Sequence, residues 1–99
     1  MQAWSSVGSA GFSAGQADWT SLALHPTTGA PYVAYTDGGN SYKATVMTFS
    51  GTAWSAVGSA GFSTGTATYT SLALRPTTLF VAYNDGTALN KATVATIGG

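Results

Sequence analysis

Short runs of alternating apolar and polar residues follow one another along the chain, and turn-forming residues separate them. Residues 20–25 alternate with Leu22 on the apolar face, and residues 43–49 alternate in the same way. Residues 32–36 are rich in side chains that favour strands, and residues 53–57 complete the series. The pattern therefore predicts four short β-strands over these ranges.

The segments between these strands carry the residues that tight turns need. Residues 26–29, 37–40 and 50–52 combine Pro, Gly, Asp, Asn and Ser, which favour reverse turns and hairpins. The Gly- and Ser-rich residues 58–65 lead to the next stretch of the chain. No window sustains the helical period, so no helix is expected. The predicted unit is a four-stranded antiparallel meander.

This unit occurs twice. Residues 3–28 and 53–78 are identical at 20 of 26 aligned positions, and residues 33–49 and 81–97 are identical at 10 of 17. Between these matches the second copy is two residues shorter, in a turn, where a change of length costs least. Such close identity indicates recent duplication or deliberate engineering, and a period of this size is typical of solenoids, propellers and arrays.

Two four-stranded meanders joined by a Gly-rich link predict an all-β fold with two antiparallel propeller blades per chain. The first repeat covers about residues 3–52 and the second about residues 53–99. A β-sandwich of about seven strands would also fit this length. The high internal identity favours the propeller, because equivalent blades have equivalent neighbours in a ring, whereas the halves of a sandwich do not.

The repeats are out of phase with the ends of the chain. Residues 3–8 repeat the fourth strand and residues 91–97 repeat the third, so the strand order is 4, 1-2-3-4, 1-2-3. Because two blades cannot close a ring, we expect residues 3–8 to complete the last blade of a neighbouring chain. This predicts a full propeller closed by homo-oligomerisation with strand exchange, as a trimer with six blades or a tetramer with eight. The residues expected to carry the assembly are Trp4, Val7, Trp54 and Val94.

The motif W-x-x-V-G-x-x-G-F-S-x-G, followed by T-S-L-A-L-x-P, V-A-Y-x-D-G and K-A-T-V, resembles propeller-type repeats of large bacterial surface or secreted proteins. The resemblance covers essentially the whole chain, in two copies. It differs from kelch repeats, which carry a Gly-Gly pair at a strand end, and from repeats that end in Trp-Asp. It implies a bacterial, extracellular parent. Two blades behind a bare Met also resemble fragments built to study how propellers arose.

Composition excludes several classes of function. The formal net charge is zero and only three residues are basic, so neither nucleic acid nor an anionic membrane surface is an expected partner. No apolar run approaches the length of a transmembrane helix, and we expect no signal peptide at the start. Because the sequence contains no cysteine, it leaves the redox compartment open.

Catalytic and metal-binding groups are sparse. The chain has one histidine, His25, and three acidic residues, none of them Glu. Asp37 and Asp85 lie in hairpin turns without the D-x-D-x-D-G spacing of a calcium loop. No local pair of carboxylates is present for glycoside hydrolysis. We therefore expect neither enzymatic activity nor a metal or other cofactor.

An alternative function is that of a lectin-like propeller module that binds glycans. Trp19 and Tyr69 occupy equivalent positions in the two repeats, and Asp18 precedes Trp19. Aromatic faces beside hydrogen-bonding groups can stack on sugar rings. The competing interpretation is that both aromatic residues pack between blades, because aromatic side chains dominate burial. The main prediction is a structural, self-assembling propeller fragment, with glycans as the alternative partner.

Overall fold

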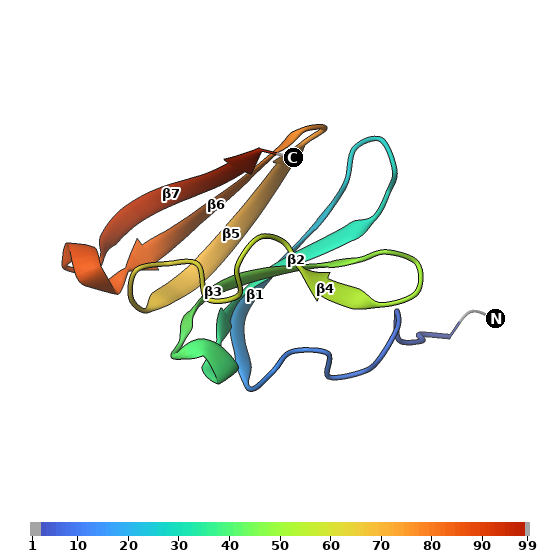
Figure 1. Ribbon diagram of the computed structural model, residues 1–99, viewed down its shortest axis with the longest axis horizontal. Helices are drawn as coiled ribbons and strands as arrows, with labels where there is room; N and C mark the ends of the chain where they lie inside the picture. The colour runs from blue at the N-terminus through green and yellow to red at the C-terminus, as the bar shows by residue number, and fades with distance from the viewer. Residues whose placement is uncertain (1–2, 99) are drawn as a thin grey trace.

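The computed structural model describes residues 3–98, which form two antiparallel β-sheets and no α-helix. The first sheet has four strands in the order β1-β2-β3-β4, and the second has three in the order β5-β6-β7 (Figure 1). The strands are β1 (Ala17–Leu24), β2 (Pro31–Asp37), β3 (Lys43–Phe49), β4 (Trp54–Ala56), β5 (Ala67–Arg75), β6 (Thr78–Asp85) and β7 (Lys91–Gly98). The predicted all-β fold of antiparallel sheets is confirmed. None of the described segments is a helix long and apolar enough to cross a membrane.

A bulge displaces the start of the first strand of each sheet. β1 begins at Ala17 instead of the expected Thr20, and its pairing with β2 shifts around Trp19, which has a φ of 53°. β5 has the same irregularity around Tyr69, also with a φ of 53°. A bulge inserts an extra residue into one strand and breaks the two-residue alternation. The alternating pattern alone therefore underestimated the length of these strands.

The hairpin between β2 and β3 closes through a single 3₁₀ turn, η1 (Gly38–Asn40), which Asp37 caps. The buried Asp37 carboxylate accepts hydrogen bonds from Gly39 N at 3.0 Å and from Thr45 Oγ1 at 2.7 Å. Burial, with the Asp37 charge as the second cause, raises the pKa of Tyr35 to about 12. Asp37 is thus a structural cap of this hairpin.

The second sheet repeats this arrangement between β6 and β7. Asp85 caps η2 (Gly86–Ala88) and accepts hydrogen bonds from Thr93 Oγ1 and Thr87 Oγ1, each at 2.7 Å. These bonds favour the ionised carboxylate and lower the pKa of Asp85. Burial, and then the Asp85 charge, raises the pKa of Tyr83. Among residues 3–98, no group of three or more histidine, cysteine or acidic side chains is placed to hold a metal ion.

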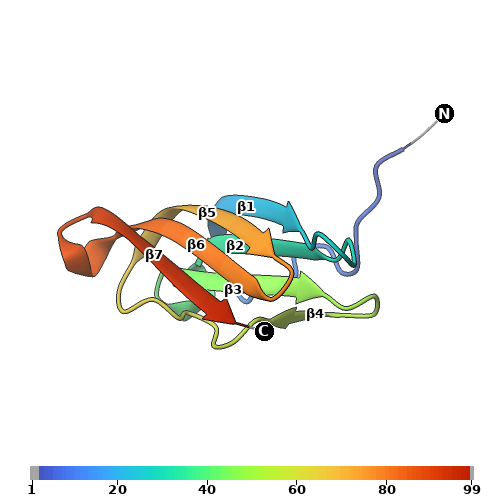
Figure 2. The ribbon, with the colours of Figure 1, turned by 90° about the horizontal axis from the view of Figure 1, so that it is seen from above.

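The hydrophobic core lies between the two sheets, which pack face to face (Figure 2). β5 lies along β1 and β2 of the first sheet. Three alanines in the core have no exposed surface, and such small side chains let the two sheets approach closely. The core residues are Ala34, Ala44 and Val46 of the first sheet and Ala67, Leu72, Leu79, Val81 and Tyr83 of the second. Every buried side-chain nitrogen or oxygen of the described residues has a hydrogen-bond partner.

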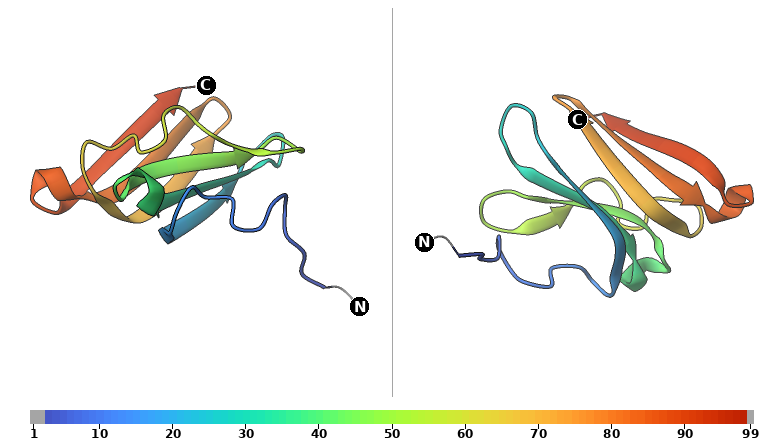
Figure 3. Two further views of the ribbon diagram at one scale, coloured as in Figure 1. Left: turned by 60° about the horizontal axis from the view of Figure 1, so that its bottom comes forward. Right: turned by 180° about the vertical axis from the view of Figure 1, so that it is seen from behind.

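The two ends of the described chain differ from the rest of the repeats. Residues 3–8 form no strand, and Trp4 is fully exposed. This segment extends away from the first sheet on the side opposite β7 (Figures 1 and 3). β4 covers the edge of β3, whereas β7 is the last strand of its sheet. Within residues 3–98, the second sheet therefore has an open edge where the first sheet has a fourth strand.

Candidate assembly site

The junction between the sheets uses one face of the first sheet and the opposite face of the second. Alternate residues of β2 and β3 form the first half, in which Ala34, Ala44 and Val46 are buried. Leu72 of β5 and Val81 of β6 are buried in the second half. Because successive side chains of a strand point to opposite faces, each sheet turns its other face outward. Those outward faces are the counterparts of the two halves of the junction.

The link between β4 and β5 continues the hydrogen bonding along the edge of β3. Val57 N donates to Val46 O at 2.8 Å, and Phe62 N donates to Ala44 O at 2.8 Å. Ser63 Oγ accepts from Ala44 N at 3.0 Å. The backbone groups at this edge, which would otherwise be open, are therefore bonded to the segment that enters the second sheet.

Hydroxyl groups fasten β5 to the first sheet. The Thr70 hydroxyl donates to Trp19 O, and the Ser21 hydroxyl oxygen accepts from Leu72 N at 3.1 Å. Both bonds join residues that belong to different repeats. Buried polar groups require such partners, so these bonds fix the position of β5 along β1.

Both halves of the junction recur on the outer faces of the chain. Leu22 is 66% exposed, whereas its counterpart Leu72 is 8% exposed. Val94 is 63% exposed, whereas its counterpart Val46 is 4% exposed. The outward face of the first sheet, which carries Leu22, is therefore equivalent in the repeat to the face that the second sheet buries in the junction. The outward face of the second sheet, which carries Val94, is equivalent to the face that the first sheet buries there.

The contacting groups of the junction also recur. Those with an identical residue in the other repeat are Ser21 (Ser71), Ser63 (Ser13), Thr70 (Thr20), Phe62 (Phe12) and Ala44 (Ala92). Across the junction the Thr36 hydroxyl donates a hydrogen bond to a backbone carbonyl, and His25 Nε2 lies 3.0 Å from another. Their counterparts Asn84 and Arg75 also carry hydrogen-bond donors. The prediction of assembly residues, which relied on aromatic and strand-end positions, missed the hydroxyl groups. Their identity in both repeats is the sequence signal that could have found them.

Trp54 in β4 demonstrates how a fourth strand is held in its sheet. Its ring stacks on Phe12, with 4.0 Å between the ring centroids and 9° between the planes. Phe49 of β3 lies 5.4 Å from the same ring, and the indole N–H donates to Val7 O at 2.8 Å. Trp54 therefore joins the outer edge of the first sheet to the segment that precedes the sheet.

The four residues expected to carry assembly fall into two groups. Val7 and Trp54 meet within the chain through the indole hydrogen bond. Trp4 and Val94 are exposed, one on the N-terminal segment and the other on β7. One chain thus leaves uncovered the two surfaces that the strand-exchange hypothesis joins between chains.

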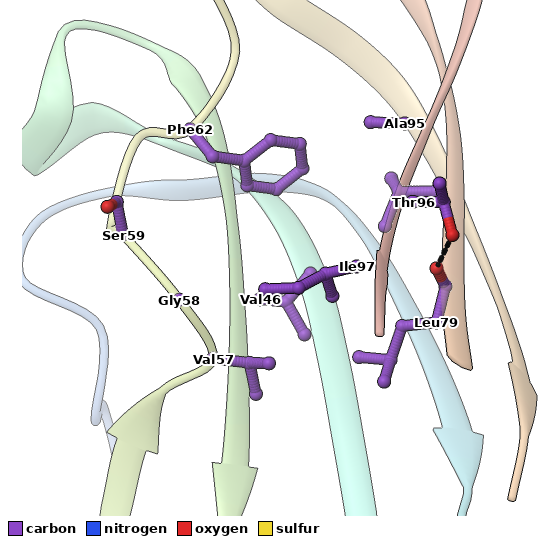
Figure 4. Close-up of a pocket in the computed structure, with 10 residues that line it drawn as sticks. Val46, Val57, Gly58, Ser59, Phe62, Leu79, Ala95, Thr96 and Ile97 are labelled. Carbon is purple, nitrogen blue, oxygen red and sulfur yellow. Dashed lines mark hydrogen bonds between the residues drawn. The ribbon is translucent and has the colours of Figure 1, made fainter. Parts of the chain in front are cut away.

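A cavity of about 150 Å³ lies between the link and the second sheet (Figure 4). Phe62 and Val57 of the link line one side, and Ile97 of β7 and Leu79 of β6 line the other. A hydrogen bond from Thr96 Oγ1 to the Leu79 carbonyl, at 2.8 Å, holds β7 against β6 here. The cavity lies beside the open edge of β7, where the first sheet has β4.

Trp19 and Tyr69, two of the candidate glycan-binding residues, are in contact with each other. Their ring centroids are 3.9 Å apart with 33° between the planes, and both side chains are partly exposed. The third candidate, Asp18, accepts hydrogen bonds from Gln16 Nε2 at 3.2 Å. One face of each ring is turned toward the other ring and is not free for a sugar. The contact supports packing between repeats, which was the competing interpretation.

The sequence Gly-Phe-Ser-x-Gly, present at residues 11–15 and 61–65, has the spacing of a hydrolase nucleophile elbow. An elbow joins a strand to a helix, but here both segments consist of turns and bends that lead into strands. Ser13 and Ser63 each donate to the carbonyl of the glycine two residues on, at 2.6 and 2.7 Å. His25 bonds to a backbone carbonyl of the second repeat at 3.0 Å. These serines therefore stabilise the turns that lead into β1 and β5.

Comparison with protein family models, curated proteins and solved structures found no match for this chain. The resemblance to bacterial propeller repeats therefore rests on the sequence pattern. The functional conclusion rests on the geometry of the junction and on the surfaces that repeat it.

Proposed function

We propose that this chain is a structural module that assembles head to tail with copies of itself into a closed β-propeller. The single observation that carries the proposal is the recurrence of both halves of the inner junction on the outer faces. A second copy can present its Leu22 face to the Val94 face of the first, with the pairing that Leu72 and Val46 have inside one chain. Ser71, Ser13 and Thr20 repeat the hydroxyl groups of the inner junction on these faces, and Asn84 and Arg75 stand in place of Thr36 and His25.

Exposed apolar surface and an open strand edge both favour this assembly. Leu22 and Leu24 of the first sheet and Val94 and Ile97 of β7 are exposed. Folded monomers seldom leave such surfaces and an unpaired edge in water. A head-to-tail contact is heterologous, so each added copy presents the same open faces until the rotation closes a ring.

Residues 3–8 of one copy supply the fourth strand of the second sheet in the next copy. In the first sheet β4 pairs with β3 through Phe49 and Trp54, Thr48 and Ser55, and Met47 and Ala56. The corresponding pairs between copies are Ile97 with Trp4, Thr96 with Ser5, and Ala95 with Ser6. Because each chain brings two blades, the ring has an even number, six in a trimer or eight in a tetramer.

Native mass spectrometry and light scattering test this proposal directly. We expect a discrete species of three or four times 9.9 kDa. Because assembly stabilises the folded state by mass action, the melting temperature should also rise with chain concentration. A folded species of 9.9 kDa at every concentration, with a melting temperature independent of concentration, contradicts the proposal.

Replacing Trp19 by Ala should loosen the packing between adjacent blades. The lost contact with the Tyr69 ring is expected to lower the free energy of unfolding by about 0.5–1.5 kcal/mol. Urea denaturation followed by circular dichroism measures the change. Tyr42→Ala, which removes a similarly exposed aromatic ring from a turn, is the matched control and should have a smaller effect.

Trp19→Ala and Tyr69→Ala together decide between packing and glycan binding. If the aromatic pair serves packing, a broad glycan array should detect no binding by the natural chain. Binding that both Trp19→Ala and Tyr69→Ala abolish, with the assembly intact, would instead favour the carbohydrate-binding module.

A further inference from the structure

We infer that the cavity beside β7 is a binding site, or seat, for an indole ring and that Trp4 of a second copy occupies it. This inference rests on the head-to-tail assembly proposed above. The cavity measures about 150 Å³ and its walls are mainly apolar. Strand exchange by itself requires only backbone pairing. A side-chain seat specifies which residue anchors the exchanged strand and where it binds.

The first sheet contains the filled form of this seat. Three groups hold Trp54: the Phe12 ring stacks on it, Phe49 packs beside it, and Val7 O accepts its N–H. An indole has a large apolar body and one hydrogen-bond donor, which requires an acceptor when buried. The site thus meets both requirements of an indole ring.

The repeat carries the same three groups into the second sheet. The counterparts of Phe12, Val7 and Phe49 are Phe62, Val57 and Ile97. All three counterparts line the cavity, and Figure 4 shows them around it. The cavity therefore offers a ring for stacking and an apolar side chain from the third strand, and it is also lined by Val57, the counterpart of the valine whose carbonyl accepts the indole N–H in the filled site.

The stacking ring is held in the same orientation in both sheets. Phe12 meets Tyr35 edge-on at 6.5 Å with 76° between the planes. Phe62 meets Tyr83 edge-on at 6.4 Å with 78° between the planes. The seat in the second sheet is therefore preformed, and binding an indole requires no rotation of Phe62.

The glycine that follows the fourth strand also adopts the same conformation in both copies. Gly8 has a φ of 69° and Gly58 a φ of 70°. A Cβ at Gly8 would lie 2.6 Å from the Phe49 ring, and a Cβ at Gly58 would lie 3.0 Å from the Ile97 side chain. Glycine thus lets the backbone pass close to the third strand in both copies, and in the first sheet the carbonyl of the preceding valine accepts the indole N–H.

Trp4 is the tryptophan that remains free to fill the seat. Of the three tryptophans in the chain, Trp54 is already stacked on Phe12 and Trp19 is in contact with Tyr69, whereas Trp4 is fully exposed. Residues 3–8 differ from residues 53–58 at one position only, Ser6 for Ala56. The segment leaves the molecule on the side away from β7 (Figure 1), so the cavity receives the Trp4 of another copy.

Trp4→Ala tests the seat because it removes the ring and keeps a backbone that can form the exchanged strand. We expect the chain concentration at which the ring dissociates to rise about 30-fold or more, as for the loss of a large buried side chain. Native mass spectrometry over a dilution series measures this change. Millimolar free indole should reverse part of it in Trp4→Ala and have no such effect on the natural chain, whose seat is filled.

The methyl signal of Ile97 reports on the seat itself. Ile97 is the only isoleucine in the sequence, so its δ1 methyl resonance is unambiguous in a selectively labelled sample. A seated indole ring should shift this resonance by its ring current. We expect Trp4→Ala to remove the shift and free indole to restore it, whereas Tyr42→Ala, a control that removes an exposed aromatic ring from the turn between β2 and β3, should leave the resonance in place.

These experiments test the indole-binding cavity and the head-to-tail assembly separately. If the natural chain forms the ring but Trp4→Ala dissociates at the same concentration and the Ile97 resonance does not move, the seat is wrong and the assembly stands. If the natural chain remains a 9.9 kDa species, the assembly and the exchange of Trp4 are both wrong.

Discussion

Replacing Leu22 by Asp should leave the single chain folded and abolish its assembly. Leu22 is 66% exposed in one chain, so a carboxylate there remains hydrated and costs the monomer little. Between copies the same position is expected to be buried as Leu72 is in the inner junction. Losing a buried leucine and burying an unpaired charge costs at least about 3 kcal/mol per contact, or roughly a 150-fold rise in Kd. Sedimentation velocity should then show a 9.9 kDa species with an unchanged circular dichroism spectrum.

Leu72→Asp is the matched control, because it makes the same change in the same local sequence. Leu72 is 8% exposed within one chain, so the substitution disrupts the inner junction. We expect it to destabilise the fold of the single chain by about 3–5 kcal/mol and to lower the melting temperature strongly. If the two variants behave alike, or if Leu22→Asp retains the assembly of the natural chain, the outer faces do not repeat the inner junction.

The three strands that follow β1 in the first sheet could be predicted closely because no bulge interrupts them. The bounds of β3 are those expected, and β2 and β4 differ from expectation by one residue at each end. β1 and β5 could not be bounded in this way because of the bulges at Trp19 and Tyr69. A bulge is set by how the strand meets its neighbours, and these contacts have no two-residue signature in the sequence.

The sequence predicted which residues of the repeats are equivalent, but it did not predict which of them contact each other. The repeat placed Trp19 and Tyr69 at equivalent positions, but equivalence between units does not show that the two rings touch. Their contact follows from the packing of β5 on β1. Residues 3–8 were expected as a strand from their identity with the β4 region, yet they form none in the single chain. A strand needs a partner for its backbone groups, and within the described residues the edge that matches this segment lies on the second sheet.

A chain that begins at Val7 should lose the closed ring. This truncation removes Trp4 and the residues that pair with β7, and it keeps the Val7 carbonyl that accepts the Trp54 N–H. Each contact of the proposed assembly would then lose a buried tryptophan and two or three backbone hydrogen bonds, about 3–5 kcal/mol in total. That loss corresponds to roughly a thousandfold rise in Kd. A dilution series followed by mass photometry should find smaller species at concentrations where the natural chain remains closed.

A permuted chain separates the two roles of the N-terminal segment. It begins at Val7 and carries Thr-Ala-Trp-Ser-Ser after Gly99, which copies the approach to β4 and lets the second sheet form its own fourth strand. The edge of β7 and the cavity are then covered within one chain, so this variant should aggregate less than the truncated chain. Because no segment crosses between copies, the contact between copies depends on the packed faces alone. We therefore expect its rings to dissociate at higher chain concentrations than those of the natural chain. Equal resistance to dilution would show that face packing alone closes the ring and that strand exchange adds nothing to it.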